Sequence, residues 1–113
     1  MTPPATPAFS QASFDAALAR FVAKAQAVHD QYQQRIAPGQ PGKIITAEPS
    51  KKYTRIWKVS RHDATRRDIY GFVDQTTGDV YSAESYRKPA PRIRGNIFAP
   101  DGGARCLGWS GAS

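Results

Sequence analysis

Residues 68–83, with the sequence DIYGFVDQTTGDVYSA, decide the fold of this chain because they contain its clearest β-hairpin signal. Aromatic and β-branched side chains flank a polar turn, which is typical of two strands that pair with each other. Gly78 suits the left-handed backbone conformation that closes a type I hairpin turn. The run therefore predicts an antiparallel hairpin, and simple alternation along it places Tyr70 and Phe72 on the same face of the sheet.

The segment that precedes the hairpin predicts two more strands. Residues 53–60 are again rich in aromatic and β-branched side chains, whereas residues 43–47 form a shorter run that is stopped by Pro49. Side chains alternate between the two faces of a strand, so Trp57 and Val59 share a face. We expect these two side chains to point inward, under a covering helix.

Downstream of the hairpin, residues 84–98 are basic and contain Pro89 and Pro91. Proline fixes its own backbone φ angle and has no N–H to donate, so it is excluded from the interior of a helix and from the centre of a sheet. This segment is therefore expected to be a stiff, extended arm that carries cationic side chains. The glycine-rich residues 104–113 are expected to form a flexible tail.

An amphipathic helix is predicted over residues 10–37. Ser10 is a good N-cap, Phe9 and Phe14 are spaced as a hydrophobic staple, and Pro38-Gly39 would end the helix. Apolar side chains recur at steps of three and four residues and form one stripe: Phe14, Leu18, Phe21, Val22, Ala25, Val28, Tyr32 and Ile36. The stripe could cover one face of the sheet, which is the interpretation we favour, or it could pair with a helix of a second copy or another protein.

These elements predict an α+β fold in which one long N-terminal helix packs on a small antiparallel sheet of three or four strands, followed by an extended C-terminal arm. A chain of 113 residues is large enough for a single domain with a modest core. We expect a flexible tail at residues 1–9 and one domain at residues 10–103. Within this domain the helix occupies residues 10–37, the sheet residues 43–83 and the arm residues 84–98.

The composition excludes several classes of protein. No apolar run approaches the roughly 20 residues needed to cross a bilayer, and residues 1–7 lack the charged start and apolar core of a secretory signal. The chain contains a single cysteine, so it forms no internal disulfide, and a reducing compartment such as the cytoplasm is expected. No contact with a membrane is expected.

Positive charge is concentrated in the C-terminal two thirds of the chain. Sixteen Lys and Arg oppose nine Asp and Glu, which gives a net charge of +7. Positions 51–94 hold eleven of these cations against five carboxylates. Such asymmetry favours a polyanionic partner, either nucleic acid or the acidic surface of a protein, although a basic surface can also serve solubility alone.

The residue types needed for catalysis or metal binding do not occur in useful patterns. Two histidines and one cysteine provide no pair of zinc ligands, and His29, on the helix, is expected to face solvent. Cys106 has no obvious neighbouring base, so it is expected to be an unreactive thiol. Asp74 and Asp79 are typical turn residues and are better explained as such than as magnesium ligands. We therefore expect a protein that is not an enzyme and that needs no cofactor or metal.

The combination of cations and aromatic rings is the pattern that indicates a binding surface. Lys and Arg attract phosphates, and aromatic faces stack on unpaired bases. No signature of a known nucleic-acid-binding motif is present, so the indication is compositional. The candidate cations are Lys58, Arg66, Arg67, Arg87, Lys88, Arg92 and Arg94, and the candidate stacking groups are Trp57, Tyr70 and Tyr86.

Four short motifs in the same region resemble a family of small uncharacterised tailed-bacteriophage proteins. The motifs are Tyr70-Gly71-Phe72-Val73-Asp74, Thr77-Gly78-Asp79-Val80, Lys88-Pro89-Ala90 and Arg94-Gly95-Asn96-Ile97-Phe98. The resemblance covers residues 53–103 and departs from the family at Ala99-Pro100, where an acidic residue is expected. It implies expression in the cytoplasm of an infected bacterium.

Three functions are consistent with these observations. The first is a non-enzymatic phage accessory protein that binds nucleic acid through a basic aromatic surface. The second is a protein that inhibits a host enzyme or a defence complex. Its basic face would dock on an acidic or nucleic-acid-binding surface of the target, and electrostatic attraction would speed their association. The third is a small virion structural protein that forms a homodimer through the apolar stripe of the helix.

Overall fold

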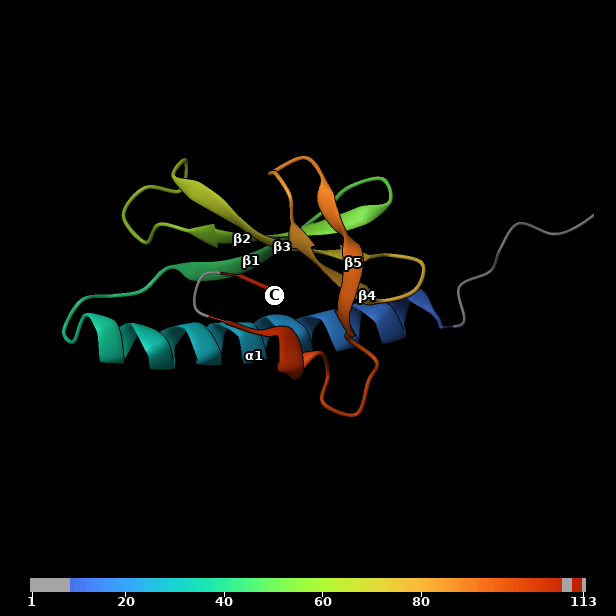
Figure 1. Cartoon of the computed structure of the whole chain (residues 1–113), viewed down its shortest axis with the longest axis horizontal. Coiled ribbons are helices and arrows are strands. Elements are labelled where there is room, and N and C mark those ends of the chain that lie inside the picture. The colour runs from blue at the N-terminus through green and yellow to red at the C-terminus, as the bar shows by residue number, and fades with distance from the viewer. Residues whose placement is uncertain (1–8, 109–110, 113) are drawn as a thin grey trace, which may run out of the picture.

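The computed structural model describes residues 9–108 and 111–112 (Figure 1), so the flexible tail expected at residues 1–9 lies outside the described part except for Phe9. The helix α1 spans Gln11–Ile36, and the strands span Ile44–Pro49 (β1), Tyr53–Val59 (β2), Arg67–Asp74 (β3), Asp79–Ala83 (β4) and Pro89–Asn96 (β5). The short 3₁₀ helix η1 spans Ala104–Cys106. Neighbouring strands are all antiparallel, and their order across the sheet follows their order in the chain.

The fold is α+β, as the sequence predicts, but the sheet has five strands instead of three or four. The additional strand is β5, which lies within the segment expected to be an unpaired arm. Pro89 and Pro91 are tolerated there because β5 is an edge strand and pairs with β4 alone. The prolines thus exclude a central position in the sheet without excluding a strand.

The N-terminal end of α1 forms as predicted. Ser10 is the N-cap, and its hydroxyl oxygen accepts a hydrogen bond from the backbone N–H of Ser13 at 3.1 Å. Phe9 stacks on Phe14, with ring centroids 5.7 Å apart, which completes the hydrophobic staple. The ring of Phe9 also lies 4.3 Å from that of Phe98, so the start of the helix is attached to the segment that follows β5.

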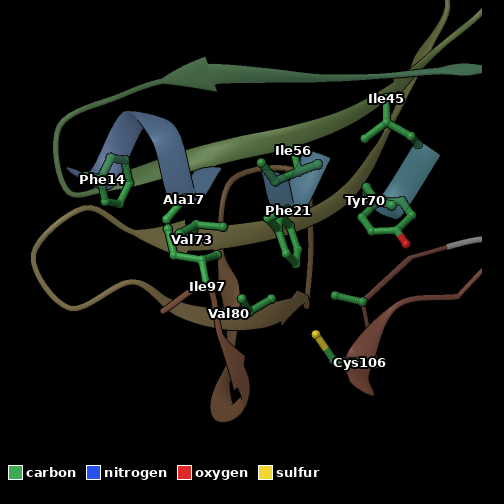
Figure 2. Packing of buried hydrophobic residues seen from close by; sticks show 12 residues of the cluster. Phe14, Ala17, Phe21, Ile45, Ile56, Tyr70, Val73, Val80, Ile97 and Cys106 are labelled. Atoms are coloured by element: carbon green, nitrogen blue, oxygen red, sulfur yellow. The ribbon is translucent and has the colours of Figure 1, made fainter. Parts of the chain in front are cut away.

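The helix lies across one face of the sheet, as Figure 1 shows, and its apolar stripe contributes to the core beneath it. The stripe residues Phe14, Phe21 and Ala25 are buried. They pack with residues from the facing side of the sheet and with Ile97, which follows β5 (Figure 2); the sheet residues are Ile45, Ile56, Tyr70, Val73 and Val80. Tyr32 and Ile36, at the far end of the stripe, remain exposed. The helix therefore acts as a lid on the sheet, which is the interpretation we favoured from the sequence.

His29 does not face solvent, so that expectation is wrong. Its side chain is 1% exposed, and its Nε2 accepts a hydrogen bond from the backbone N–H of Lys43 at 2.9 Å. Gln26, on the same side of the helix, donates to the carbonyl of Lys43 and accepts from the N–H of Ile45. These bonds attach the start of β1 to α1 and satisfy backbone groups at the outer edge of the sheet.

A β-bulge between β2 and β3 changes which residues face the helix. The register shifts between Ile56 and Trp57, and Tyr70 is the residue of β3 that has no partner in β2. Such a bulge lets Tyr70 turn toward α1 and join the core. Phe72 lies on the opposite face, where its ring centroid is 6.0 Å from that of Tyr53. The expectation that Tyr70 and Phe72 share a face is therefore wrong, because strict alternation fails at a bulge.

Trp57 also lies on the face of the sheet that is turned away from α1. Ile56, the residue before it, is buried beneath the helix, so alternation directs Trp57 and Val59 to the other face. The prediction that these two side chains point inward, under the helix, is wrong. Trp57 is nevertheless only 6% exposed, because other side chains cover it on that face.

The described part of the glycine-rich C-terminal segment lies against the core. Cys106 is buried, and burial raises the pKa of its thiol, which donates a hydrogen bond to the carbonyl of Gly103. Farther along, the hydroxyl of Tyr70 donates to the carbonyl of Gly108 at 2.7 Å. The backbone N–H of Ala112 donates to the carbonyl of Tyr70 at 3.0 Å. The segment expected to be a flexible tail thus includes residues that complete the core.

Candidate functional site

The face of the sheet that α1 leaves uncovered carries a groove of about 510 Å³, lined by Trp57, Arg67, Asp68, Ile69 and Tyr86. We call it the Trp57–Tyr86 groove. Four of these residues belong to β2 and β3, whereas Tyr86 belongs to the loop between β4 and β5. In Figure 1 this loop stands above the sheet, on the side opposite α1. The groove therefore combines two segments that are far apart in the sequence.

Arg67 covers the ring of Trp57 in this groove. Its guanidinium carbon lies 4.0 Å from the centroid of the indole, which is the geometry of a cation–π contact. Glu48, on β1, holds both groups: its carboxylate accepts hydrogen bonds from Arg67 Nη1 at 3.1 Å and from Trp57 Nε1 at 3.3 Å. The Arg67 side chain is 42% exposed and Trp57 is 6% exposed, so a ligand would meet the guanidinium before the indole.

Tyr86 is the aromatic group that the groove exposes to solvent. Its side chain is 56% exposed, and the guanidinium carbon of Arg87 lies 5.1 Å from its ring centroid. Arg55, on β2, donates from Nε to the carbonyl of Tyr86 at 3.2 Å. The loop itself is closed by a backbone hydrogen bond from the N–H of Glu84 to the carbonyl of Lys88. These bonds tie the Tyr86 loop to the sheet beneath it.

A second hollow of about 440 Å³ has two lining residues, Arg67 and Asp68, in common with the groove. Its lining consists of Lys43, Ser60, Thr65, Arg66, Arg67 and Asp68. Lys43 forms an ion pair with Asp68, and the hydrogen bond from Lys43 lowers the pKa of that carboxyl. Arg66 is exposed and, within the described part of the chain, forms no ion pair. The hollow therefore has an excess of positive charge beside the aromatic groove.

The comparisons with known proteins place the chain in one family. The family of unknown function DUF7717 matches residues 10–113, a range that begins at the N-cap of α1 and includes every described element. The chain belongs to DUF7717. No curated protein and no solved structure matches it. Among the residues that the structure describes, no helix is both long and apolar enough to cross a membrane.

In this DUF7717 chain, the structure brings five of the ten predicted binding residues together. Those in or beside the Trp57–Tyr86 groove are Trp57, Arg66, Arg67, Tyr86 and Arg87. Arg67 and Tyr86 line the groove itself, Arg87 lies against Tyr86, and Arg66 lines the hollow that shares Arg67. The other five residues lie elsewhere, for reasons that differ from one residue to the next.

The remaining predicted cations of this DUF7717 chain are partly buried, paired with a carboxylate or placed on another strand. Lys58 lies on the face of β2 that is turned to α1, where burial lowers its pKa. Lys88 forms an ion pair with Glu84 at 3.3 Å. Arg92 is exposed on the edge strand β5. Arg94 is half-buried, and its Nε is buried with no hydrogen-bond partner among the described residues.

Tyr70 is not available for stacking, so that part of the site prediction is wrong. It is 1% exposed beneath α1, and its hydroxyl is hydrogen-bonded to the backbone of Gly108. Burial raises the pKa of Tyr70 to about 12. The bulge in β3 explains the error, because it directs Tyr70 into the core and away from the face that carries Trp57.

Sequence reasoning did not select Arg55 and Glu48, although both shape the groove. Arg55 follows the same alternation as Trp57 along β2, so its place on the open face was readable from the pattern. Glu48 could not be found in this way, because its partner Arg67 is nineteen positions farther along the chain. Its position depends on the pairing of β1 with β2, in which Glu48 lies opposite Arg55.

The carboxylates of the hairpin act as turn residues, as the sequence predicts. Asp74 accepts hydrogen bonds from the backbone N–H groups of Thr76 and Thr77 at 2.7 and 3.2 Å. Asp79 accepts from the hydroxyl of Thr77 at 2.8 Å. Among the described residues, no group of three or more His, Cys, Asp or Glu side chains is placed to hold a metal ion.

Acidification is expected to weaken the folded state through Glu48. The hydrogen bonds from Arg67 and Trp57 lower the pKa of Glu48 below its usual value. The unfolded chain therefore binds a proton at this carboxylate before the folded protein does, as the pH falls. The stabilisation is complete above the usual pKa of a glutamate and is lost as the pH falls through the lowered value. Urea midpoints measured across the acidic range should show this loss.

The matched control for this measurement is Glu48→Gln, which keeps the side-chain length and removes the titrating group. The midpoint of this variant should depend less steeply on pH than that of the unmodified protein. Other carboxylates with lowered pKa values, among them Asp63, Asp68 and Asp101, will leave a residual dependence in both proteins. Identical profiles would show that Glu48 does not contribute.

Proposed function

We propose that this protein is a non-enzymatic phage accessory protein that binds nucleic acid through the face of the sheet opposite α1. The observation that carries the proposal is the Trp57–Tyr86 groove, where guanidinium groups and aromatic rings from two chain segments meet. Cationic side chains bind phosphates by releasing counterions, and aromatic faces stack on bases. The resemblance of residues 53–103 to phage proteins supports an accessory role in the cytoplasm of an infected bacterium.

The charges around the groove support this proposal because several of them are not neutralised by nearby carboxylates. Within the described part of the chain, Arg66 and Arg87 form no ion pair, and both are exposed. Arg67 is paired with Glu48, which fixes its position. A polyanion bound here would therefore meet two uncompensated cations in addition to the fixed guanidinium of Arg67.

Binding is expected to weaken steeply as the salt concentration rises. Fluorescence anisotropy with labelled oligonucleotides, over a series of salt concentrations, measures the slope of the logarithm of affinity against the logarithm of salt. Each phosphate contact that is lost should reduce this slope by roughly 0.7 to 0.9. The double variant Arg66→Ala with Arg87→Ala should therefore bind more weakly and with a shallower slope.

The matched control removes the same charge from the exposed side of α1, with Arg20→Ala and Arg35→Ala. This variant should keep the slope of the unmodified protein, because these residues lie on the far side of the molecule from the groove. Equal losses in the two double variants would show that net charge alone governs binding. A protein that binds no nucleic acid at low salt would remove the proposal.

A further inference from the structure

The lining of the Trp57–Tyr86 groove suits a planar, mostly apolar group better than a phosphate. Trp57 and Ile69 give it an apolar floor, whereas Arg67 and Tyr86 offer planar groups on which a flat ring can stack. Asp68, which also lines the groove, forms an ion pair with Lys43 and therefore adds no uncompensated charge to it. The groove therefore has the chemistry of a site for a nucleobase.

The neighbouring hollow has the complementary chemistry. Arg66, Lys43 and the hydroxyl-bearing Ser60 and Thr65 line it, and it shares Arg67 and Asp68 with the groove; Lys43 neutralises the carboxylate of Asp68 through an ion pair. Arginine and hydroxyl groups are common donors to phosphate oxygens. Because Arg67 lines both sites, a nucleotide whose base enters the groove can place an adjacent phosphate at this hollow.

Both stacking groups are held in place before a ligand arrives. The carboxylate of Glu48 accepts hydrogen bonds from Arg67 and from Trp57, so the guanidinium is fixed above the indole. The Tyr86 loop is tied to β2 by the bond from Arg55. Side chains that are already ordered lose less conformational entropy on binding. The groove is thus organised to receive a flat ring.

We infer that the ligand is single-stranded nucleic acid, with an unpaired base stacked in the groove on Tyr86 and Arg67 and an adjacent phosphate bound at Arg66. The bases of a duplex are stacked on one another and cannot enter such a groove without being extruded. This inference rests on the proposed function but goes further, because binding through charge alone would accept single strands and duplexes alike.

The test compares three probes of equal length with the full chain: a single-stranded oligothymidine, the same backbone with abasic sites in place of the bases, and a duplex. The abasic strand keeps every phosphate and removes every base. At moderate salt the oligothymidine should bind roughly 5- to 150-fold more tightly than the abasic strand, which is the range expected for stacking of one base. The duplex, whose bases cannot enter the groove, should bind more weakly than the oligothymidine.

Variants of Tyr86 locate the effect in the groove. Tyr86→Ala should lose roughly the same 5- to 150-fold for oligothymidine and nothing for the abasic strand, whereas Tyr86→Phe should retain tight binding. Tyr86 is exposed, so both variants should fold, and a thermal melt checks this. If oligothymidine and one of the other probes bound with equal affinity, the inference would be overturned, and the proposed nucleic-acid binding would be explained by charge alone. Failure of all three probes to bind would overturn the proposed function as well.

Discussion

Replacing Tyr70 by alanine is expected to lower the free energy of unfolding by about 3–5 kcal/mol, the usual cost of removing a large aromatic ring from a core. Tyr70 is 1% exposed and packs in the cluster beneath α1. Because small domains are stable by only about 5–15 kcal/mol, this is a large fraction of the total. Urea unfolding followed by circular dichroism measures the change.

Tyr86→Ala is the matched control, because it removes the same side chain from the surface and should change stability by no more than about 0.5 kcal/mol. Tyr70→Phe keeps the ring and removes only the hydroxyl, so it measures the contribution of the hydroxyl alone. The carbonyl of Gly108 then loses this hydrogen-bond donor, which should cost about 1–3 kcal/mol of stability. If Tyr70→Ala were as mild as Tyr86→Ala, the placement of Tyr70 in the core would be wrong.

The features that the sequence predicts well are those set by neighbouring residues. The capping oxygen of Ser10 and the staple between Phe9 and Phe14 involve positions no more than five apart, so their spacing carries the information. The same is true of Gly78, whose φ of 77° closes the turn between β3 and β4. Local spacing therefore establishes the long helix and the central hairpin.

The features that the sequence does not predict depend on contacts between distant segments. His29 looks like a surface residue of the helix until β1 supplies the backbone N–H of Lys43 as its partner. β5 contains Pro89 and Pro91, which disfavour a strand, yet it pairs with β4 at the edge of the sheet. In both cases the tertiary structure overrides the local preference.

The candidate site also has one feature that the sequence predicts and one that depends on contacts between distant segments. Composition indicates that cations and aromatic rings form the binding surface, but it does not show which of these side chains lie together in the groove. The bulge at Tyr70 decides that, because it turns one aromatic ring into the core while Trp57 stays on the open face. The return of the chain through β4 then brings Tyr86 to the same face. One irregularity in the sheet thus separates the residue that stabilises the fold from those that form the groove.

Replacing Gly103 by alanine is expected to cost about 2–5 kcal/mol of stability, for two reasons that add. Gly103 has a φ of 86°, a left-handed conformation that costs a residue with a Cβ roughly 1–2 kcal/mol. A Cβ at this position would also lie 2.9 Å from Cδ2 of Phe21, and overpacking of a core typically costs about 1–3 kcal/mol. Urea unfolding of the variant measures the sum.

Gly39→Ala measures the cost of the backbone conformation without the steric cost, because Gly39 has a similar φ of 82° but no atom lies within 4 Å of its added Cβ. This control should lose only the roughly 1–2 kcal/mol that the left-handed conformation costs. Adding Phe21→Leu to Gly103→Ala should then make the combined loss of stability smaller than the sum of the two single losses, because the smaller side chain makes room for the methyl group. A double-mutant cycle measures this coupling, which should be about 0.5–3 kcal/mol. Equal losses at Gly39 and Gly103 would show that Phe21 does not pack closely against Gly103.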